Sequence, residues 1–213
     1  YNRDEIAIFM DFPFLNFFKI IGGLFPARRL NKSLRVLAMV NTAMVFIVAM
    51  FSPFYAVYVQ DKIGGSLAIA GFSWAVYPIV AGILIFLFSQ LGMKVKEQEL
   101  LLAVGYFIRG LVFLSYAFMG NVAQLIFTQV LWGIGSALGV PAFDATYGKH
   151  TSSEKSIAEW GQWEGMAYVA TGAAALISGF VIQLVGYFWL FCLMSAASIF
   201  LGIYIWLLPR DLL

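Results

Sequence analysis

Residues 165–209 contain no Asp, Glu, Lys or Arg, and this absence of charge constrains the fold more than any motif in the chain. Three shorter stretches, 36–60, 63–93 and 110–143, are also free of charge. A soluble domain places charged residues every few positions, because its surface must stay hydrated. A helix needs about 20 apolar residues to cross a bilayer core of roughly 30 Å. Each stretch is therefore long enough for one or two membrane crossings.

The composition agrees with a membrane protein. Hydrophobic residues make up 62% of the chain and charged residues 11%, against about 25% charged in soluble domains. The apolar runs are continuous, whereas a transmembrane β-barrel would alternate apolar and polar residues. The sequence therefore predicts an all-α, polytopic membrane helix bundle. Its expected partner is the lipid bilayer that surrounds it.

Several other functions are disfavoured by what the chain contains. The net charge of +2 indicates no nucleic-acid partner, because the basic residues lie in loops between apolar runs. Cys192 is the single cysteine, so no disulfide forms within the chain. His150 has no second His or Cys near it, so we expect no metal site, and no motif indicates a cofactor. Clustered acids, His, Ser or Cys of the kind a membrane enzyme needs are not evident, so we expect no enzyme.

Breaks inside the apolar runs predict six transmembrane helices. The expected spans cover residues 36–59, 67–91, 99–118, 122–147, 160–185 and 187–208. Only Gly186 separates the last two, which predicts a tight helical hairpin. The six spans form one domain, residues 35–210, whose two parts would be residues 35–119 and 122–208.

The basic residues predict the orientation in the membrane. Lys and Arg concentrate in the cytoplasmic loops of membrane proteins. In a six-span zigzag, nine of them fall on one side: Arg28, Arg29, Lys32, Arg35, Lys94, Lys96, Lys149, Lys155 and Arg210. Lys62 stands alone on the other side. We expect a multi-pass protein of the cell's inner or plasma membrane with both termini in the cytoplasm.

Residues 1–34 form a separate N-terminal arm. The apolar segment 14–25 is bounded by Pro13 and Pro26 and is too short to span. An amphipathic helix lying in the cytoplasmic interface fits this pattern, with the basic residues after it near anionic headgroups. An arm packed on the helix bundle fits it equally well.

The arrangement of loops and glycines resembles a known family. A basic loop (92–96) follows the second span, the fourth span carries a glycine-rich sequence (129–137), and a longer polar loop (148–159) comes next. Over about residues 36–208, this is similar to one six-helix half of a major facilitator superfamily transporter. The resemblance implies two inverted triplets of helices, in which Pro53 and Pro141 would kink the first helix of each.

The resemblance implies a secondary transporter that moves a small solute by alternating access, without naming the solute or a coupling proton or ion. One half supplies only one wall of the pathway, so the partner would be a second transporter half or a second copy of the chain. The sequence also departs from the family. Ser89 and Gln90 replace an acid and a base in the loop motif, and Gln129 replaces an arginine in the fourth span. These losses favour an alternative, a non-transporting membrane scaffold or interaction protein.

A few polar residues inside the spans are the candidate cavity or gating residues. Arg109 lies near the middle of the third span, where an arginine costs at least about 2.5–3.5 kcal/mol unless something compensates it. Glu164 and Asp144 are the acids that we consider as its partners, with Glu164 the better placed. The functional interpretation of Arg109 is a contact to an anionic solute or a gating pair. The structural one is an arginine tied to the carbonyls of a neighbouring helix.

Neutral polar and aromatic residues complete the candidate set. Gln129 and Asn41 either line the cavity or cross-link helices. Tyr55, Trp74 and Tyr77 are candidate cavity aromatics, although aromatic side chains also face lipid. Two small-residue pairs, Gly135 with Gly139 and Gly161 with Gly165, predict close approach of helix backbones.

Overall fold

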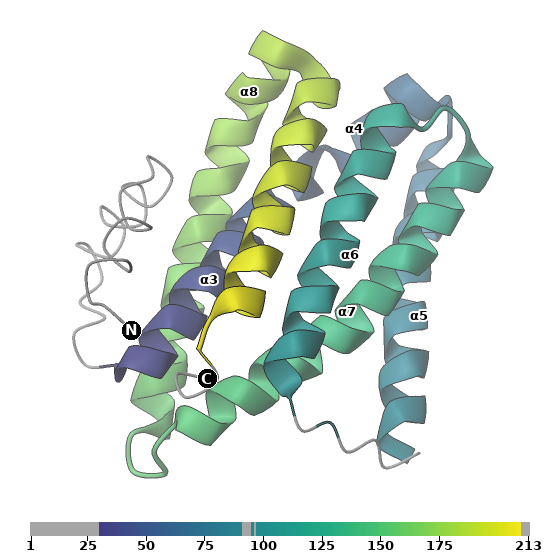
Figure 1. Ribbon diagram of the computed structural model, residues 1–213. Helices are drawn as coiled ribbons and strands as arrows, with labels where there is room; N and C mark the ends of the chain where they lie inside the picture. The colour runs from purple at the N-terminus through teal and green to yellow at the C-terminus, as the bar shows by residue number, and fades with distance from the viewer. Residues whose placement is uncertain (1–29, 91–94, 96, 210–213) are drawn as a thin grey trace.

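The structure, a computed structural model, describes residues 30–90, 95 and 97–209, and every regular element in that part is helical. The elements are α3 (Lys32–Ala49), the 3₁₀ turn η2 (Ser52–Phe54), α4 (Tyr55–Tyr58), the π-helical turn η3 (Val59–Ile63), α5 (Leu67–Gln90), α6 (Gln98–Phe118), α7 (Val122–His150) and α8 (Ser156–Leu207). Figure 1 shows them as a bundle of long helices. The predicted all-α class is confirmed. The interfacial arm falls mostly in residues 1–29, outside the described part.

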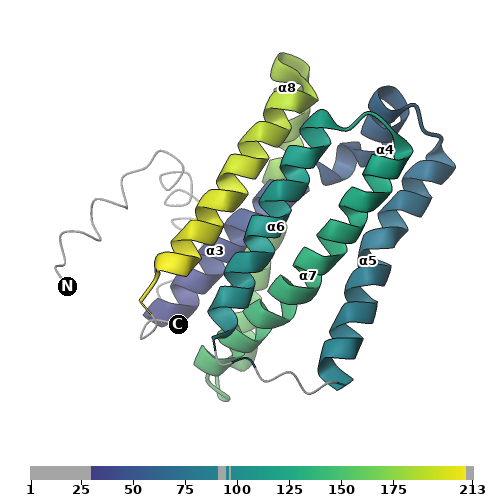
Figure 2. The ribbon, with the colours of Figure 1, turned by 45° about the vertical axis from the view of Figure 1, so that its right-hand side comes forward.

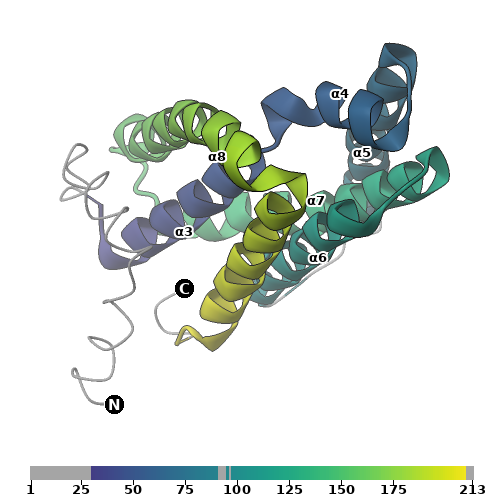
Figure 3. The ribbon, with the colours of Figure 1, turned by 90° about the horizontal axis from the view of Figure 1, so that it is seen from above.

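In the described part of the chain, five helical stretches are long and apolar enough to cross a membrane, the first running from α3 through η3. The fifth is α8, 52 residues long, whose helical backbone is interrupted at Gly186 (φ 77°, ψ 174°). A positive φ is a conformation that glycine adopts without steric cost, and there α8 folds back on itself as a hairpin (Figures 1 and 3). The hairpin agrees with the expected turn. That each arm crosses the bilayer, giving six spans, stays a prediction, as does the inverted repeat.

Local hydrogen bonds and a glycine fix where several helices begin and end. Asn31 precedes α3 and its side-chain oxygen accepts a hydrogen bond from the backbone of Leu34 at 2.8 Å. Asn121 caps α7 in the same way through Gln124 at 3.0 Å. Such caps satisfy backbone donors that the first helical turn leaves free. At the other end of the first stretch, Gly64 takes a left-handed backbone (φ 73°) and ends η3.

Proline acts differently in the two helices that the sequence pairs. At Pro53 the first stretch leaves the α-helical path and passes through the 3₁₀ turn η2. Pro141 instead lies inside α7, which is helical from Val122 to His150. A third proline, Pro78, lies inside α5. The correspondence of Pro53 with Pro141 therefore gives no support to a repeat.

The helices pack in a defined order. α6 contacts both α7 and α8, α5 packs mainly on α7, and α3 packs on α8 with a smaller contact to α7. From above, α3 runs between the two arms of α8 (Figure 3). α5 lies at the edge beside α7 (Figure 2) and exposes large side chains, including Phe72 (63%) and Phe86 (63%). In a bilayer, lipid can cover such apolar side chains.

One of the two glycine pairs makes a close helix contact. A Cβ on Gly105 of α6 would lie 2.8 Å from the Cα of Gly139, so the backbones of α6 and α7 almost touch. Around Gly161 and Gly165, no atom of the described residues lies within 4 Å of such an added Cβ. The sequence prediction is thus confirmed for Gly139, whereas for the pair in α8 it stays a prediction.

Candidate functional site

A buried glutamine joins three helical segments. Gln129 of α7 is only 1% exposed. Its amide nitrogen donates to the hydroxyl of Tyr55 in α4 at 2.7 Å and to the hydroxyl of Tyr116 in α6 at 2.9 Å. Its carbonyl oxygen Oε1 is buried without a hydrogen-bond partner among the described residues. Gln129 therefore cross-links helices, and it also leaves one acceptor unsatisfied.

The network extends from Tyr55 into α5. The hydroxyl groups of Tyr55 and Ser73 lie 2.6 Å apart, and Ser73 also donates to the backbone oxygen of Ile69 at 2.7 Å. Because a serine has one hydroxyl proton, Tyr55 is the donor to Ser73. Gln129 therefore donates to Tyr55, Tyr55 donates to Ser73, and Ser73 donates to the backbone oxygen of Ile69. This chain ties α7, α4 and α5 together by directed bonds.

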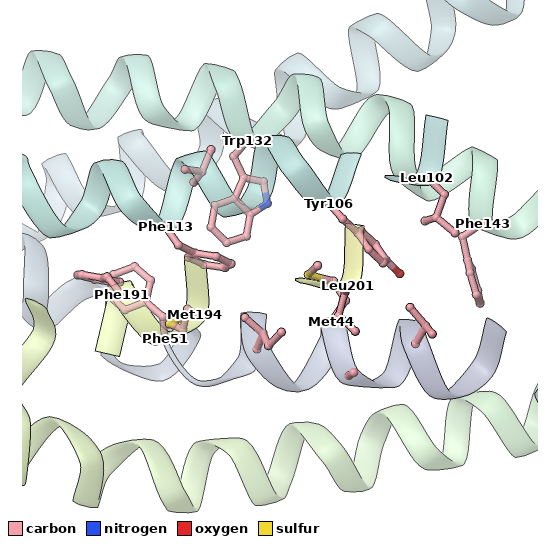
Figure 4. Close-up of a cluster of buried hydrophobic side chains, with 14 of the residues drawn as sticks. Met44, Phe51, Leu102, Tyr106, Phe113, Trp132, Phe143, Phe191, Met194 and Leu201 are labelled. Carbon is pink, nitrogen blue, oxygen red and sulfur yellow. The ribbon is translucent and has the colours of Figure 1, made fainter. Parts of the chain in front are cut away.

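Aromatic rings fill the space where the first helix breaks. The ring centre of Phe51 lies 5.0 Å from that of Tyr116 and 4.8 Å from that of Phe191. Phe51 and Phe191 lie together at one end of the core, with Trp132 and Tyr106 nearer its middle (Figure 4). Tyr58 adds a hydrogen bond from its hydroxyl to the backbone oxygen of Tyr116 at 2.7 Å. The irregular segment is therefore held by packing on α6 and α8.

The three candidate aromatics lie in one row. Tyr55 contacts Trp74 (4.9 Å between ring centres), Trp74 contacts Tyr77 (5.3 Å), and Tyr77 contacts Trp132 of α7 (5.8 Å). Trp74 is 36% exposed, whereas Tyr55 is 4% exposed. The row thus runs from the buried Gln129 network through the exposed Trp74 of α5 to the buried Trp132 of α7.

Arg109 belongs to a second group, formed by α6 and α3. Its guanidinium carbon lies 5.9 Å from the ring centre of Tyr106, a distance that permits a cation–π interaction. The Tyr106 hydroxyl accepts a hydrogen bond from the side-chain amide of Asn41 at 3.1 Å. Arg109 is partly exposed, but its Nε atom is buried with no hydrogen-bond partner among the described residues. Two residues singled out separately by the sequence, Asn41 and Arg109, are brought together through Tyr106.

Sequence comparison now identifies the family. A family model described as Major Facilitator Superfamily matches residues 37–212. The chain belongs to the major facilitator superfamily. It is a membrane transporter by family, and members of this superfamily are transporters rather than enzymes. Comparisons with curated proteins and with solved structures found no match.

In this major facilitator protein the two candidate acids lie apart from the polar groups above. Glu164 and Asp144 are both exposed. No ion pair joins Arg109 to either carboxylate in the part of the chain that the structure describes, and no hydrogen bond ties it to a neighbouring carbonyl there. The expected pairing with Glu164 is therefore not formed, and neither is the structural alternative of an arginine held by backbone oxygens.

Four residues of this transporter's polar groups are missing from the sequence-based candidates: Ser73, Tyr106, Tyr116 and Trp132. Tyr106 lies near the middle of its span, whereas tyrosine in membrane proteins is enriched at the interfaces. A tyrosine at that depth is a signal that could have pointed to a buried hydroxyl. Among the described residues, no group of three or more His, Cys, Asp or Glu could hold a metal ion.

The hydrogen bond between Gln129 and Tyr116 is expected to contribute measurably to the free energy of unfolding. In a double-mutant cycle of Gln129→Leu and Tyr116→Phe, we expect a coupling of about 0.6 kcal/mol, and at most ~1.7 kcal/mol, as for other hydrogen bonds between membrane helices. Reversible unfolding of the purified protein in mixed micelles gives the four free energies. The control pairs Gln129→Leu with Tyr204→Phe, where we expect additivity. Additivity of the first pair would show that the bond to Tyr116 does not stabilise the fold.

Proposed function

We propose that the chain is a secondary transporter that moves a small solute by alternating access, with six membrane crossings. The family match over residues 37–212 is the observation that carries this proposal. It is supported by helices of membrane-spanning length and by the turn at Gly186, which would make the two arms of α8 the fifth and sixth crossings. Transporter sites typically lie near the bilayer midplane between two repeats or halves.

Six crossings supply one wall of such a pathway, so the proposal includes a second wall. It would come from a second copy of this chain or from another transporter half. The candidate residues of this wall are Arg109 with Asn41, and the row Tyr55, Trp74 and Tyr77. Gln129, buried between two tyrosines, acts as the bond that holds this wall together rather than as a contact to the solute.

The alternative, a non-transporting membrane scaffold, is favoured by the departures from the family motifs and by one contact in the structure. Gln129 uses both amide protons in bonds to Tyr55 and Tyr116 within the bundle. This arrangement suits static packing of helices. Transport by the purified protein separates the two functions.

The test is uptake into vesicles. Purified chain is reconstituted into liposomes, and a panel of radiolabelled small solutes is offered with and without an imposed proton gradient. We expect at least one solute to accumulate above the level in protein-free liposomes. If the folded and inserted chain takes up none of the panel under either condition, alone or as a cross-linked dimer, the result contradicts transport and favours the scaffold function.

The proposed orientation places both termini and the loop after α7 in the cytoplasm. Lys62 and Lys149 are both exposed and stand at opposite ends of the bundle's helices. With Cys192→Ser as background, we expect Lys62→Cys to react with a membrane-impermeant maleimide added to intact cells. Lys149→Cys should react only after the membrane is opened. The reverse pattern would invert the topology.

A further inference from the structure

The starts of α3 and α8 and the end of α7 meet at one end of the bundle, at the lower left of Figure 1. The side-chain nitrogen of Asn31, the residue before α3, donates to the backbone oxygen of His150 at the end of α7, at 3.1 Å. In the loop after α7, the backbone N–H of Ser152 donates to the carboxylate of Glu159 in α8 at 2.8 Å. Segments 119 residues apart in sequence are thereby held together in one junction.

Three lysines are exposed at this junction. Lys32 is the first residue of α3, Lys149 lies in the last turn of α7, and Lys155 is the residue before α8. All three side chains are exposed, so a ligand outside the bundle can reach them. None of them forms an ion pair with a carboxylate of the described residues. The junction therefore presents positive charge that the described part of the chain does not neutralise by direct pairing.

The other charged groups around the junction are already occupied or too few. Glu154 is the exposed acid of the loop, whereas Glu159 is only 7% exposed and accepts the hydrogen bond from the loop backbone. Asp144 is exposed on α7, more than a turn before the end of that helix. Arg35, one turn into α3, donates to the backbone oxygen of Leu30 at 3.3 Å. We therefore assign the uncompensated charge to the three lysines.

Neighbouring side chains indicate the depth of the junction in the membrane. The rings of Tyr147 and Trp160 pack with their centres 4.7 Å apart, and both residue types are enriched where the bilayer meets water. Ile157, in the first turn of α8, is 92% exposed. An exposed isoleucine close to lysines suits the level at which lipid headgroups meet acyl chains. The ligand that fits this place is therefore a lipid.

The excess of positive charge selects the class of lipid. In phosphatidylcholine the phosphate carries an ammonium group of its own, which lysines repel. Phosphatidylglycerol carries the phosphate charge alone, and each lysine near an anionic membrane surface strengthens the attraction. Lysine also binds phosphate as a point charge, without the fixed geometry that arginine requires.

We propose that the junction of α3, α7 and α8 binds the headgroup phosphate of an anionic phospholipid, with Lys32 and Lys149 as its principal contacts. The phosphate bridges the start of α3 and the end of α7, and so reinforces the hydrogen bond between Asn31 and His150. This lipid site goes beyond the proposed function and does not depend on it, because a scaffold could hold the same lipid.

The test is thermal unfolding of the purified full chain in nonionic maltoside micelles that are titrated with phosphatidylglycerol or phosphatidylcholine. We expect phosphatidylglycerol to reach half of its stabilising effect at a concentration at least fivefold lower than phosphatidylcholine needs, because one lysine contributes roughly this factor. Soluble glycerol phosphate supplies the same phosphate without acyl chains. Equal stabilisation by phosphatidylcholine, or full stabilisation by glycerol phosphate at the same concentration, would overturn the proposal.

Variants locate the site. Lys32→Gln and Lys149→Gln should each raise the phosphatidylglycerol concentration for half effect roughly fivefold. Lys62→Gln removes the same charge from an exposed position at the other end of the bundle and should leave that concentration unchanged. An equal shift in Lys62→Gln would show attraction to net charge rather than to a site, which contradicts the proposal.

A lipid contact and a structural role of the lysines differ in phosphatidylcholine. There, Lys32→Gln and Lys149→Gln should be as stable as the native chain or more stable, since each substitution removes one of several like charges. In phosphatidylglycerol the same variants should be less stable than the native chain. A loss of stability that is equal in the two lipids would mean that the lysines support the fold directly, and the proposal would be wrong.

Discussion

Arg109→Ala is expected to abolish uptake of the transported solute, and Arg109→Lys is expected to keep a part of it. The alanine variant removes the charge together with its donors, whereas lysine restores a charge without the planar fork. Uptake into liposomes, normalised to inserted protein, measures both. We expect the alanine variant to fall at least ~10-fold, to the background of protein-free vesicles, which corresponds to about 1.4 kcal/mol or more.

The control for this prediction is Arg35→Ala, at an exposed position near the start of α3. Uptake by this variant should stay close to that of the native chain. Undiminished uptake by correctly inserted Arg109→Ala would remove Arg109 from the pathway. It would then be a residue whose burial is tolerated for reasons of packing alone.

Gly105→Ala is expected to lower the stability of the protein strongly, because the added methyl group has no room between α6 and α7. The new Cβ would lie 2.8 Å from the Cα of Gly139 and 2.9 Å from the backbone oxygen of Gly135. These are backbone atoms that no side-chain rotation can move, so α6 and α7 must separate. Overpacking of this kind costs about 1–3 kcal/mol. Thermal unfolding in detergent measures the loss.

Gly172→Ala is the matched control, since Gly172 is also a helical glycine but no atom of the described chain lies within 4 Å of the added Cβ. Alanine is the better helix former by about 1 kcal/mol, so this variant should be unchanged or more stable. A Gly105→Ala protein as stable as the Gly172→Ala protein would mean that α6 and α7 do not approach so closely.

The helical class and the hairpin at Gly186 were predictable from the sequence, because a bilayer restricts which backbone structures can cross it. Continuous apolar runs predicted helices, and the absence of charge on either side of Gly186 predicted a hairpin, because hydrocarbon allows few alternatives for a polar backbone. The break in the first helix was expected at Pro53. Its form, with the successive turns η2, α4 and η3, depends on aromatic packing with α6 and α8, which no local pattern encodes.

Some members of the candidate site were predictable from the sequence, whereas their hydrogen-bond partners were not. Gln129 and Asn41 stood out as neutral polar residues inside the bilayer, and Tyr55 as an aromatic residue that could line a cavity. Their partners are contributed by helices distant in sequence, such as Tyr116 for Gln129 and Tyr106 for Asn41. Choosing Glu164 for Arg109 assumed that opposite charges pair. The fold instead keeps Glu164 exposed and gives Arg109 an aromatic neighbour.

The same principle explains the two glycine pairs. A small-x-x-x-small pattern shows that a close approach is allowed, but the partner helix decides whether it occurs. Gly139 meets Gly105, itself a glycine, so two backbones can touch. Gly161 and Gly165 have no helix opposite them within the described chain.

The hairpin at Gly186 also bears on how the chain enters the membrane during synthesis. Neither arm from 165 to 209 carries a charged side chain, and the turn itself is a single glycine. No polar loop has to be translocated, so both arms can leave the translocon as one unit. The basic residues that flank them, Lys149 and Lys155 before and Arg210 after, would then retain both ends on the same side. A lysine placed beside Gly186 would have to be translocated across the membrane, so insertion of the two arms would become slow.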